Sequence, residues 1–409
     1  SLTSTCPNSP VRAGRRSERV GRTLVVTNDF PPRAGGIQAF VHNVLLHQPP
    51  ESVVVYAPKW KRAPEFDAEQ PFPVVRHPTS LMLPEPVVLA KARAIAQEYE
   101  CTRLMFGAAA PLGLLTPRLR RQGLAPVIAL THGHEAAWAV TPGARQVLRT
   151  IGNSVDNITY LGQYTRARIA SALRPDAAAR MRRLVPGVDV QTFNPDVREK
   201  GRAVRAELGL ADRPVVVVVS RLMPRKGQDT LIRALPAIQR QVPDAALLIV
   251  GGGPYRSRLE TLVEETSVAD SVVLTGGVAW EDLPAHYAAG DVFAMPCRTR
   301  NRGWDVEGLG IVYLEAGAVG LPVIAGNSGG APDAVLEGET GFVVDGRDLA
   351  QVADRVSELL RDPELAQQMG RRGRAWVEQQ WSWPIVSRRL TDLLEGVDPD
   401  LAHPIAGVQ

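Results

Sequence analysis

The stretch from Met295 to Gly330, MPCRTRNRGWDVEGLGIVYLEAGAVGLPVIAGNSGG, contains the features on which the interpretation of the whole chain depends. The apolar run from Asp291 to Met295 predicts a buried strand, which a polar loop follows as far as Glu307. Glycines then open a predicted helix from Leu309 to Val319, and a glycine and a proline end it. This succession of strand, loop and helix is the repeating unit of a parallel sheet covered by helices.

Two glutamates in this stretch, Glu307 and Glu315, are separated by seven residues. We expect Glu307 just before the helix and Glu315 on its second turn, so both carboxylates can line one crevice. The glycines leave unpaired backbone N–H groups at the helix start, where they and the macrodipole favour an anion such as a diphosphate. The pattern predicts a nucleotide-sugar site, with sugar hydroxyls on Glu307 and ribose hydroxyls on Glu315. The alternative is that both glutamates belong to an ordinary solvated helix face.

The composition bounds the class of protein. With 409 residues, 44% hydrophobic and 22% charged, the chain is long enough for two ordinary globular domains. Apolar runs stay well below the roughly 18 residues that a membrane span needs. Three widely spaced cysteines, Cys6, Cys101 and Cys297, favour a reducing cytosol over a disulfide framework. Residues 1–21 lack the apolar core of a signal peptide and are interpreted as a disordered or non-native extension.

The net charge of +4 is unevenly distributed. Residues 22–195 contain 20 lysines and arginines against 12 acidic residues, whereas residues 196–409 contain 23 against 30. The first half of the chain therefore carries a positive field, which suits an anionic surface such as nucleic acid or the headgroups of an inner membrane leaflet.

Short apolar runs alternate with amphipathic stretches in both halves, which predicts an α/β fold of two doubly wound, Rossmann-like domains facing a central cleft. We expect an N-terminal domain over residues 22–190, a C-terminal domain over 191–378, a C-terminal helix over 379–396 and a tail over 397–409. The boundary is set by the turn-rich segment VPGVDVQTFNP, Val185 to Pro195. Ligands of such folds lie at the carboxyl ends of the strands.

Two loops of the first half are candidate binding sites. Gly35 and Gly36 follow the first predicted strand and open a helix, where a diphosphate can approach the backbone, although a plain tight turn explains them equally well. His132 and His134, with Glu135 next to them, follow a later strand. A metal site is conceivable, but no third ligand of suitable spacing is evident, so we expect a polar contact to a sugar or its phosphate.

In the second half, Arg221 and Lys226 leave a predicted strand in a loop that leads to a helix. Both cations can stabilise the charge that develops on a departing diphosphate, as a metal ion does elsewhere. The alternative is a solvated basic surface. The only pair of DxD spacing, Asp398 and Asp400, lies in the Pro-rich tail, so we expect no metal. The dinucleotide fingerprint GxGxxG is absent, since Arg256 replaces its last glycine, which argues against a nicotinamide or flavin oxidoreductase.

Together these residues resemble the family 4 retaining glycosyltransferases of the GT-B fold. The motifs NDFPPRAGGIQ, THGHE, SRLMPRKGQDT and DVEGLGIVYLEA are most similar to those of actinobacterial mannosyltransferases that elongate phosphatidylinositol mannosides. The resemblance implies GDP-mannose as donor, a mannosylated phosphatidylinositol as acceptor, transfer with retention and no metal cofactor. One departure is Asp333, where many relatives carry glutamate.

The resemblance also implies roles for individual residues. It assigns the catalytic roles to Arg221 and Lys226 on the β-phosphate, Glu307 on mannose hydroxyls and His132 on the mannose. Further donor-binding residues are then Gly35, Gly36, Gly277, Val278, Gly308, Leu309, Gly310, Ile311 and Glu315, with guanine near Gly277 and Val278. Asp29 and Arg33 are candidates for the acceptor side.

The lipid acceptor gives the basic first half a reason. Lys59, Trp60, Lys61 and Arg62 form one cluster and Arg118, Arg120 and Arg121 another. We expect a cytoplasmic enzyme held peripherally on the inner face of the plasma membrane, with no nucleic acid partner. The alternatives are a related transferase that uses UDP-glucose or UDP-N-acetylglucosamine, and a non-catalytic nucleotide-binding membrane protein.

Overall fold

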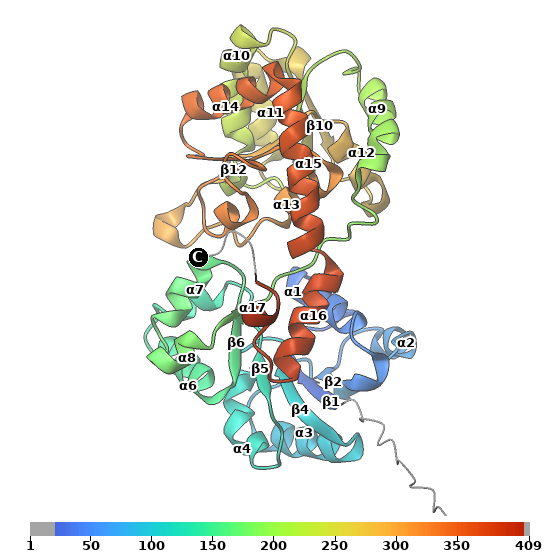
Figure 1. Ribbon diagram of the computed structural model, residues 1–409, viewed down its shortest axis with the longest axis vertical. Coiled ribbons are helices and arrows are strands. Elements are labelled where there is room, and N and C mark those ends of the chain that lie inside the picture. The colour runs from blue at the N-terminus through green and yellow to red at the C-terminus, as the bar shows by residue number, and fades with distance from the viewer. Residues whose placement is uncertain (1–20, 405–409) are drawn as a thin grey trace, which may run out of the picture.

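The computed structural model describes residues 21–404 and contains two separate parallel sheets, one in each lobe of the molecule (Figure 1). The strands of the first sheet are β1 (Arg22–Val26), β2 (Val53–Pro58), β3 (Val74–His77), β4 (Cys101–Phe106), β5 (Val127–Ala129), β6 (Asn157–Tyr160) and β7 (Arg182–Arg183). Those of the second are β8 (Val215–Val219), β9 (Ala246–Val250), β10 (Val272–Gly276), β11 (Val292–Met295), β12 (Val323–Gly326) and β13 (Gly341–Val344).

The strand order is β3-β2-β1-β4-β5-β6-β7 in the first sheet and β10-β9-β8-β11-β12-β13 in the second. In each sheet the chain first proceeds to one side of the opening strand and then continues on the other side. That reversal defines a doubly wound sheet, and it opens a crevice at the carboxyl ends of the strands. The prediction of two doubly wound domains is confirmed.

Helices cover both sheets. The first lobe contains α1 (Gly36–Leu46), α2 (Ala63–Ala68), α3 (Pro86–Glu98), α4 (Thr116–Arg120), α5 (Glu135–Trp138), α6 (Ala144–Ser154), α7 (Gln163–Ala170) and α8 (Pro175–Ala179). The second contains α9 (Arg198–Glu207), α10 (Gln228–Gln241), α11 (Arg256–Glu265), α12 (Leu283–Ala288), α13 (Ile311–Val319) and α14 (Leu349–Arg361). None of the helices described here is both long and apolar enough to cross a membrane.

The strands follow the apolar runs of the sequence because the central ones are covered on both faces. All five valines of β8 are buried, and β8 pairs in parallel with β9 and β11. Two strands, β3 and β7, do not follow such a run. Val74–His77 is a four-residue strand between prolines, and Arg182–Arg183 carries no apolar side chain, so neither has a hydrophobic pattern to detect.

The end of the chain returns from the second lobe to the first. Helix α15 (Pro363–Gln380) packs on α13, and α16 (Trp383–Leu394) packs on α1. The ring of Trp383 lies 6.4 Å from that of Phe40, and the Gln48 side chain donates to Ser387 Oγ at 2.9 Å. We propose residue 190 as the domain boundary, since it lies in the irregular segment between β7 and the turn η3 (Pro195–Val197).

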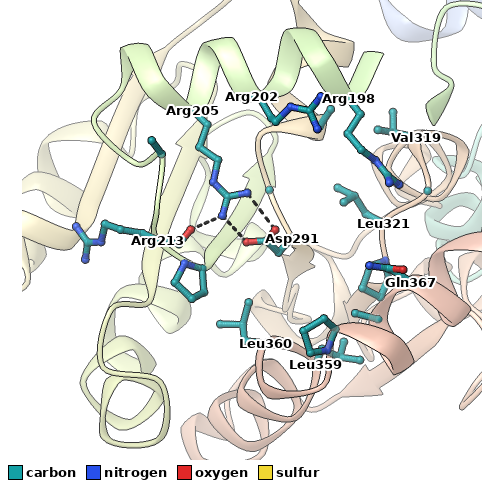
Figure 2. A pocket seen from close by; sticks show the side chains of 18 of the residues that line it. Arg198, Arg202, Arg205, Arg213, Asp291, Val319, Leu321, Leu359, Leu360 and Gln367 are labelled. Atoms are coloured by element: carbon teal, nitrogen blue, oxygen red, sulfur yellow. Dashed lines mark hydrogen bonds and ion pairs between the residues drawn. The ribbon is translucent and has the colours of Figure 1, made fainter. Parts of the chain in front are cut away.

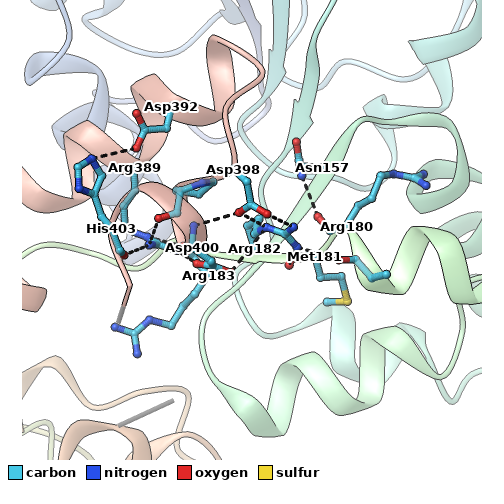
Figure 3. Close-up of polar contacts among 12 residues, drawn as sticks. Asn157, Arg180, Met181, Arg182, Arg183, Arg389, Asp392, Asp398, Asp400 and His403 are labelled. Atoms are coloured by element: carbon cyan, nitrogen blue, oxygen red, sulfur yellow. Dashed lines mark hydrogen bonds and ion pairs between the residues drawn. The ribbon is translucent and has the colours of Figure 1, made fainter. Parts of the chain in front are cut away.

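The part of the tail that the structure describes is anchored to the first lobe (Figure 3). Helix α17 (Pro399–Ala402) is flanked by Asp398, which receives two hydrogen bonds from Arg182, and contains Asp400, which pairs with Arg389 at 2.5 Å. The DxD-spaced carboxylates are therefore partners of arginines. Residues 1–20 of the predicted extension and 405–409 of the predicted tail lie outside the described residues.

Candidate active site

A cavity of about 560 Å³ lies between the two lobes. The first lobe lines it with residues of the loop after β5, of α5 and of α7, and the second lobe lines it with residues of the loop after β11. Both loops follow the carboxyl ends of strands, where parallel sheets place their ligands. Of the predicted site residues, the cavity brings together His132, Glu307 and Gly308.

The wall from the second lobe has a buried ion pair at its centre. Glu307 is 5% exposed, and its Oε2 lies 2.7 Å from Lys226 Nζ. Arg225 is the second cation, with its Nε 3.7 Å from the same oxygen and its Nη1 3.4 Å from Asp305 Oδ1. Sequence analysis did not single out Arg225, because nothing in the loop distinguishes it from its neighbours. Two cations thus converge on one carboxylate at the end of β8 and β11.

The backbone of Glu307 is fixed by the loop after β12. Its N–H donates to Ser328 Oγ at 3.2 Å, and its carbonyl accepts from the N–H of Gly330 at 3.0 Å. Gly329 has a φ of 55°, and a Cβ there would come within 1.9 Å of the Glu307 carbonyl oxygen. Only glycine allows this close approach, so the position of Glu307 is built into two loops.

Glu315 occupies the second turn of α13, as predicted, and is 8% exposed. Its Oε2 accepts a hydrogen bond of 2.6 Å from the hydroxyl of Tyr287 on α12. Burial raises the pKa of Glu315, and the Tyr287 hydrogen bond partly opposes that rise. Tyr287, which sequence analysis missed, therefore orients one carboxylate oxygen and leaves the other for a ligand.

The helix of this site begins at Ile311 rather than at the predicted Leu309, because Gly310 adopts a left-handed conformation with a φ of 77°. A Cβ on Gly308 would meet no atom within 4 Å. The backbone at Gly308 is therefore open to close approach by a ligand just before α13, where unpaired N–H groups favour an anion.

The wall from the first lobe centres on His132. Its Nε2 lies 2.6 Å from the carbonyl oxygen of Gly107, an acceptor, so Nε2 carries the proton and Nδ1 is left as an acceptor. Its backbone N–H donates to the buried Glu135 at 2.9 Å. Burial lowers the pKa of His132, against the opposing attraction of Glu135. The imidazole is thus held neutral and oriented at the cavity.

The glycines and the charged residues of the first loop lie at the start of α1. A Cβ on Gly36 would meet no atom within 4 Å, whereas one on Gly35 would lie 2.0 Å from Gln38 Oε1. The Gln38 side chain donates to Asp29 at 2.9 Å, and the guanidinium of Arg33 lies 5.4 Å from the centre of the Trp60 ring. Gln38 therefore links Asp29 to the first turn of α1, while the Arg33 guanidinium lies over Trp60 of the Lys59–Arg62 cluster.

The remaining predicted residues are not brought into contact with this cavity. Arg221 follows β8 and is exposed, and its side chain makes no hydrogen bond or ion pair with any residue that the structure describes. Gly277 and Val278 follow β10, beside the glycines after β9, since Gly251 donates to the Gly276 carbonyl at 2.9 Å. Among residues 21–404, no cluster of three or more His, Cys, Asp and Glu side chains could hold a metal ion. The His134 ring stacks with that of His132, and its Nε2 lies 3.3 Å from Glu135 Oε1.

A second cavity, of about 650 Å³, lies at the other end of the strands of the second sheet (Figure 2). Arginines of α9 face an apolar floor there, and Arg205 pairs with Asp291 at 2.7 Å. Pro214, Asp291 and Pro322 in its lining precede strands β8, β11 and β12. This cavity is thus at the amino ends of the strands, away from the loops that carry the predicted site.

Comparison with known proteins gives concordant results. Residues 202–376 match the family model described as glycosyl transferases group 1. The chain is 53% identical to a GDP-mannose-dependent alpha-(1-6)-phosphatidylinositol monomannoside mannosyltransferase of Mycolicibacterium smegmatis, over 91% of this chain and 98% of that protein. It is 48% identical to the GDP-mannose-dependent monoacylated alpha-(1-6)-phosphatidylinositol monomannoside mannosyltransferase of Corynebacterium glutamicum, over 91% and 98%.

Among solved structures, Alr3699/HepE of Anabaena in complex with UDP superposes with a TM-score of 0.73. The alignment covers 92% of this chain and 100% of that one at 20% identity, so this likeness concerns the fold alone.

Proposed function

Because this chain belongs to the group 1 glycosyltransferases of the GT-B fold, we propose that it transfers mannose from GDP-mannose to a mannosylated phosphatidylinositol, with retention of anomeric configuration. The printed names of the two relatives support the donor and the acceptor class. The observation that carries the proposal is the Lys226–Glu307 pair of 2.7 Å at the cavity between the lobes. We propose that the lysine of this pair binds a phosphate and that the glutamate beside it binds sugar hydroxyls.

In the resting site, Lys226 and Arg225 neutralise the buried Glu307. A donor that enters with its diphosphate at the start of α13 brings new negative charge to these cations and hydroxyl donors to the carboxylate. The cations then stabilise the charge that grows on the β-phosphate as the glycosidic bond breaks. Arg221, which is exposed at the end of β8, is within the same group of strand-end loops and is proposed to reach the diphosphate once it is bound.

On the sugar side, the protonated Nε2 of His132 donates to the Gly107 carbonyl. Its Nδ1 is therefore proposed to accept a hydrogen bond from a hydroxyl of the mannose. Glu315 is proposed to accept hydrogen bonds from the ribose hydroxyls through the carboxylate oxygen that Tyr287 does not contact. Guanine is proposed near Gly277 and Val278. We propose a same-face displacement in which the departing phosphate helps to deprotonate the acceptor hydroxyl, without a metal ion.

The acceptor is a lipid, and the surface beside the first loop suits a membrane. Trp60 is 38% exposed in the Lys59–Arg62 cluster, and Leu81, Leu83 and Val87 in the next loop and helix start are 54%, 45% and 66% exposed. Lys59 donates from its backbone to Thr79 at 2.9 Å, and the Asn28 side chain donates to the Met82 carbonyl at 2.9 Å. Cations and exposed apolar side chains therefore gather next to the first loop.

We propose that this surface, defined by Lys59 to Arg62 with Leu81, Leu83 and Val87, binds the anionic inner leaflet of the plasma membrane from the cytoplasm. The cluster on α4 contributes less, since Arg120 is already paired with Asp156 at 2.6 Å.

The direct test is transfer of radiolabelled mannose from GDP-mannose to purified phosphatidylinositol monomannoside in mixed vesicles. We expect a dimannosylated lipid, an unchanged rate in EDTA, and competition by GDP but not by UDP. Transfer from UDP-glucose in its place, or binding of GDP with no transfer to any mannosylated lipid, would contradict the proposal.

A further inference from the structure

Beside the cavity, a carboxylate of the second lobe contacts the first lobe. Asp333 lies in the turn η8 (Ala331–Ala334) after β12, and its Oδ2 accepts a hydrogen bond of 2.7 Å from the backbone N–H of Gln163. Gln163 is the first residue of α7 in the first lobe. Asp333 is half-buried, and the two partners are 170 residues apart in the chain.

Within its own segment α7 is capped only in part, because the Thr165 hydroxyl accepts from the Gly162 N–H at 3.2 Å and leaves the N–H of Gln163 without a partner there. The residue before it is Gly162, which has no side chain to accept from the first N–H groups. A carboxylate is among the best partners for these groups, because it satisfies an unpaired donor and complements the helix dipole. Asp333 supplies that carboxylate from the other lobe, so the cap of α7 is complete only when the lobes are together.

The shape of Gly162 is what admits the carboxylate. A Cβ on Gly162 would lie 2.2 Å from Asp333 Oδ2. The φ of Gly162 is −153°, which is extended backbone that any residue adopts, so its lack of a side chain serves the contact and not its own conformation. A methyl group here would therefore displace the Asp333 carboxylate from the N–H of Gln163 without straining α7.

At its other end, η8 is connected to the proposed donor site. Ser328 and Gly330, in the loop before Asp333, hold the backbone N–H and carbonyl of Glu307, and the Asp333 N–H donates to the Gly330 carbonyl at 3.1 Å. On the first lobe, α7 contributes Tyr164, Thr165 and Arg168 to the cavity. A continuous path of hydrogen bonds therefore joins Glu307, through Asp333, to the helix that forms the facing wall.

The charge on Asp333 is supported from the first lobe. Burial raises the pKa of Asp333, whereas the Gln163 N–H and the buried Arg183 oppose that rise. Arg183 itself stacks over Trp381 at the joint between α15 and α16, with its guanidinium 4.0 Å from the ring centre. Arg183 therefore connects the surroundings of Asp333 to the point where the chain crosses between the lobes.

From these contacts we infer that Asp333 is a positioning residue that clasps the two lobes: by capping α7 across the cleft, it holds the first-lobe wall against the Glu307 loop in the closed state. Its effect on turnover rests on the proposed mannosyl transfer, whereas its effect on closure does not. Since guanosine diphosphate is proposed to bind mainly to the second lobe, loss of the clasp should leave most of that affinity intact.

The test compares Asp333→Ala, Asp333→Glu and Gly162→Ala with a matched control, Asp362→Ala. Asp362 caps α15 within one lobe, where it accepts from the Leu365 N–H at 2.9 Å. For each variant, GDP affinity is measured by calorimetry, kcat and KM by mannose transfer, and the radius of gyration with GDP by small-angle X-ray scattering.

We expect Asp333→Ala and Gly162→Ala to lower kcat/KM about tenfold, the factor that loss of one helix cap corresponds to. GDP affinity should stay within about twofold, because no contact of the second lobe with GDP changes. Both variants should keep a larger radius of gyration in GDP, Asp333→Glu should recover part of the turnover, and Asp362→Ala should lower the melting temperature without opening the cleft.

A radius of gyration equal to that of the parent in both Asp333→Ala and Gly162→Ala would overturn the clasp. A loss of GDP affinity as large as the loss of kcat/KM would also overturn it, because it would place Asp333 in the donor site. If the parent protein transfers no mannose to any lipid, the proposed function fails, while the scattering of the variants still decides whether the clasp exists.

Discussion

The two walls of the cleft reach their working geometry by different means. In the second lobe, Glu307 and Glu315 are buried and held by partners of their own lobe, Lys226 and Tyr287. In the first lobe, the helix α7 receives its cap from Asp333 of the other lobe. His132 is also held within its own lobe, so the difference concerns the α7 part of the first-lobe wall, which is proposed to be completed only when the lobes close. Such an order lets an enzyme bind a nucleotide first and assemble its reaction site afterwards.

The comparison also concerns charge. The second half of the chain is net acidic, yet cations converge on Glu307 at its cleft edge. The first half is net basic, and the exposed cations of its Lys59–Arg62 cluster lie beside the first loop and outside the lining of the cavity. Buried charges therefore serve the proposed chemistry in one lobe, whereas exposed charges serve the proposed attachment in the other.

The sharpest test of the second-lobe wall is removal of its cation. Lys226→Ala is expected to lower kcat about 10²-fold or more, because one fixed stabiliser of developing charge is lost and Glu307 is left buried without its nearest partner. Initial rates of mannose transfer measure it, and Lys200→Ala, on exposed α9, is the control. Arg221→Ala tests the exposed arginine in the same way, and turnover of both variants within a few-fold of the parent removes the leaving-group role.

A smaller effect is expected at the ribose end of the same wall. Glu315→Gln is expected to weaken GDP binding about tenfold, which corresponds to the loss of one hydrogen bond to a charged group. Tyr287→Phe removes the bond that opposes the raised pKa of Glu315, so its GDP affinity should fall at a higher pH than that of the parent. Calorimetric titration with GDP from pH 5 to pH 8 measures both. Equal pH profiles of Tyr287→Phe and the parent would contradict this arrangement.

The state of His132 in the first-lobe wall is tested by the pH dependence of the free energy of unfolding. Because burial lowers the folded-state pKa of His132 below its ordinary value of 6.5, the unfolded chain binds the proton more readily. Stability from this residue is present above pH 6.5 and is lost as the pH falls toward the folded-state pKa, at up to about 1.4 kcal/mol per pH unit. The free energy of urea unfolding should therefore fall more between pH 7 and pH 5 for the parent than for His132→Gln. An equal fall in both proteins would exclude a buried neutral imidazole.

The smallest effect is expected at the proposed membrane surface. Lys61→Gln should weaken binding to vesicles with anionic lipids about fivefold, since one cation near such a surface contributes on the order of 1 kcal/mol. Sedimentation with vesicles at physiological salt measures it, with Lys200→Gln of the second lobe as the control. If both substitutions weaken binding equally, the attraction is a general effect of charge and the comparison between the lobes fails on this point.

Part of this architecture could be predicted from the sequence alone. Strands such as β8 and β11 are runs of apolar residues because both faces of a central parallel strand are buried, and the glycines around α13 mark its ends because only they adopt left-handed backbone there without strain. The spacing of Glu307 and Glu315 follows from that helix. These are local requirements, so they leave a local pattern.

Only the tertiary structure decided which side chains meet. Arg225 approaches Glu307, Tyr287 donates to Glu315 and Asp333 caps α7, and each of these partners comes from a different segment of the chain. A hydrogen bond between residues as far apart as 163 and 333 depends on how two sheets and the crossing helix α16 pack, and packing is a property of the whole chain that no short stretch records. The sequence therefore determined the two walls, and their packing determined how one wall holds the other.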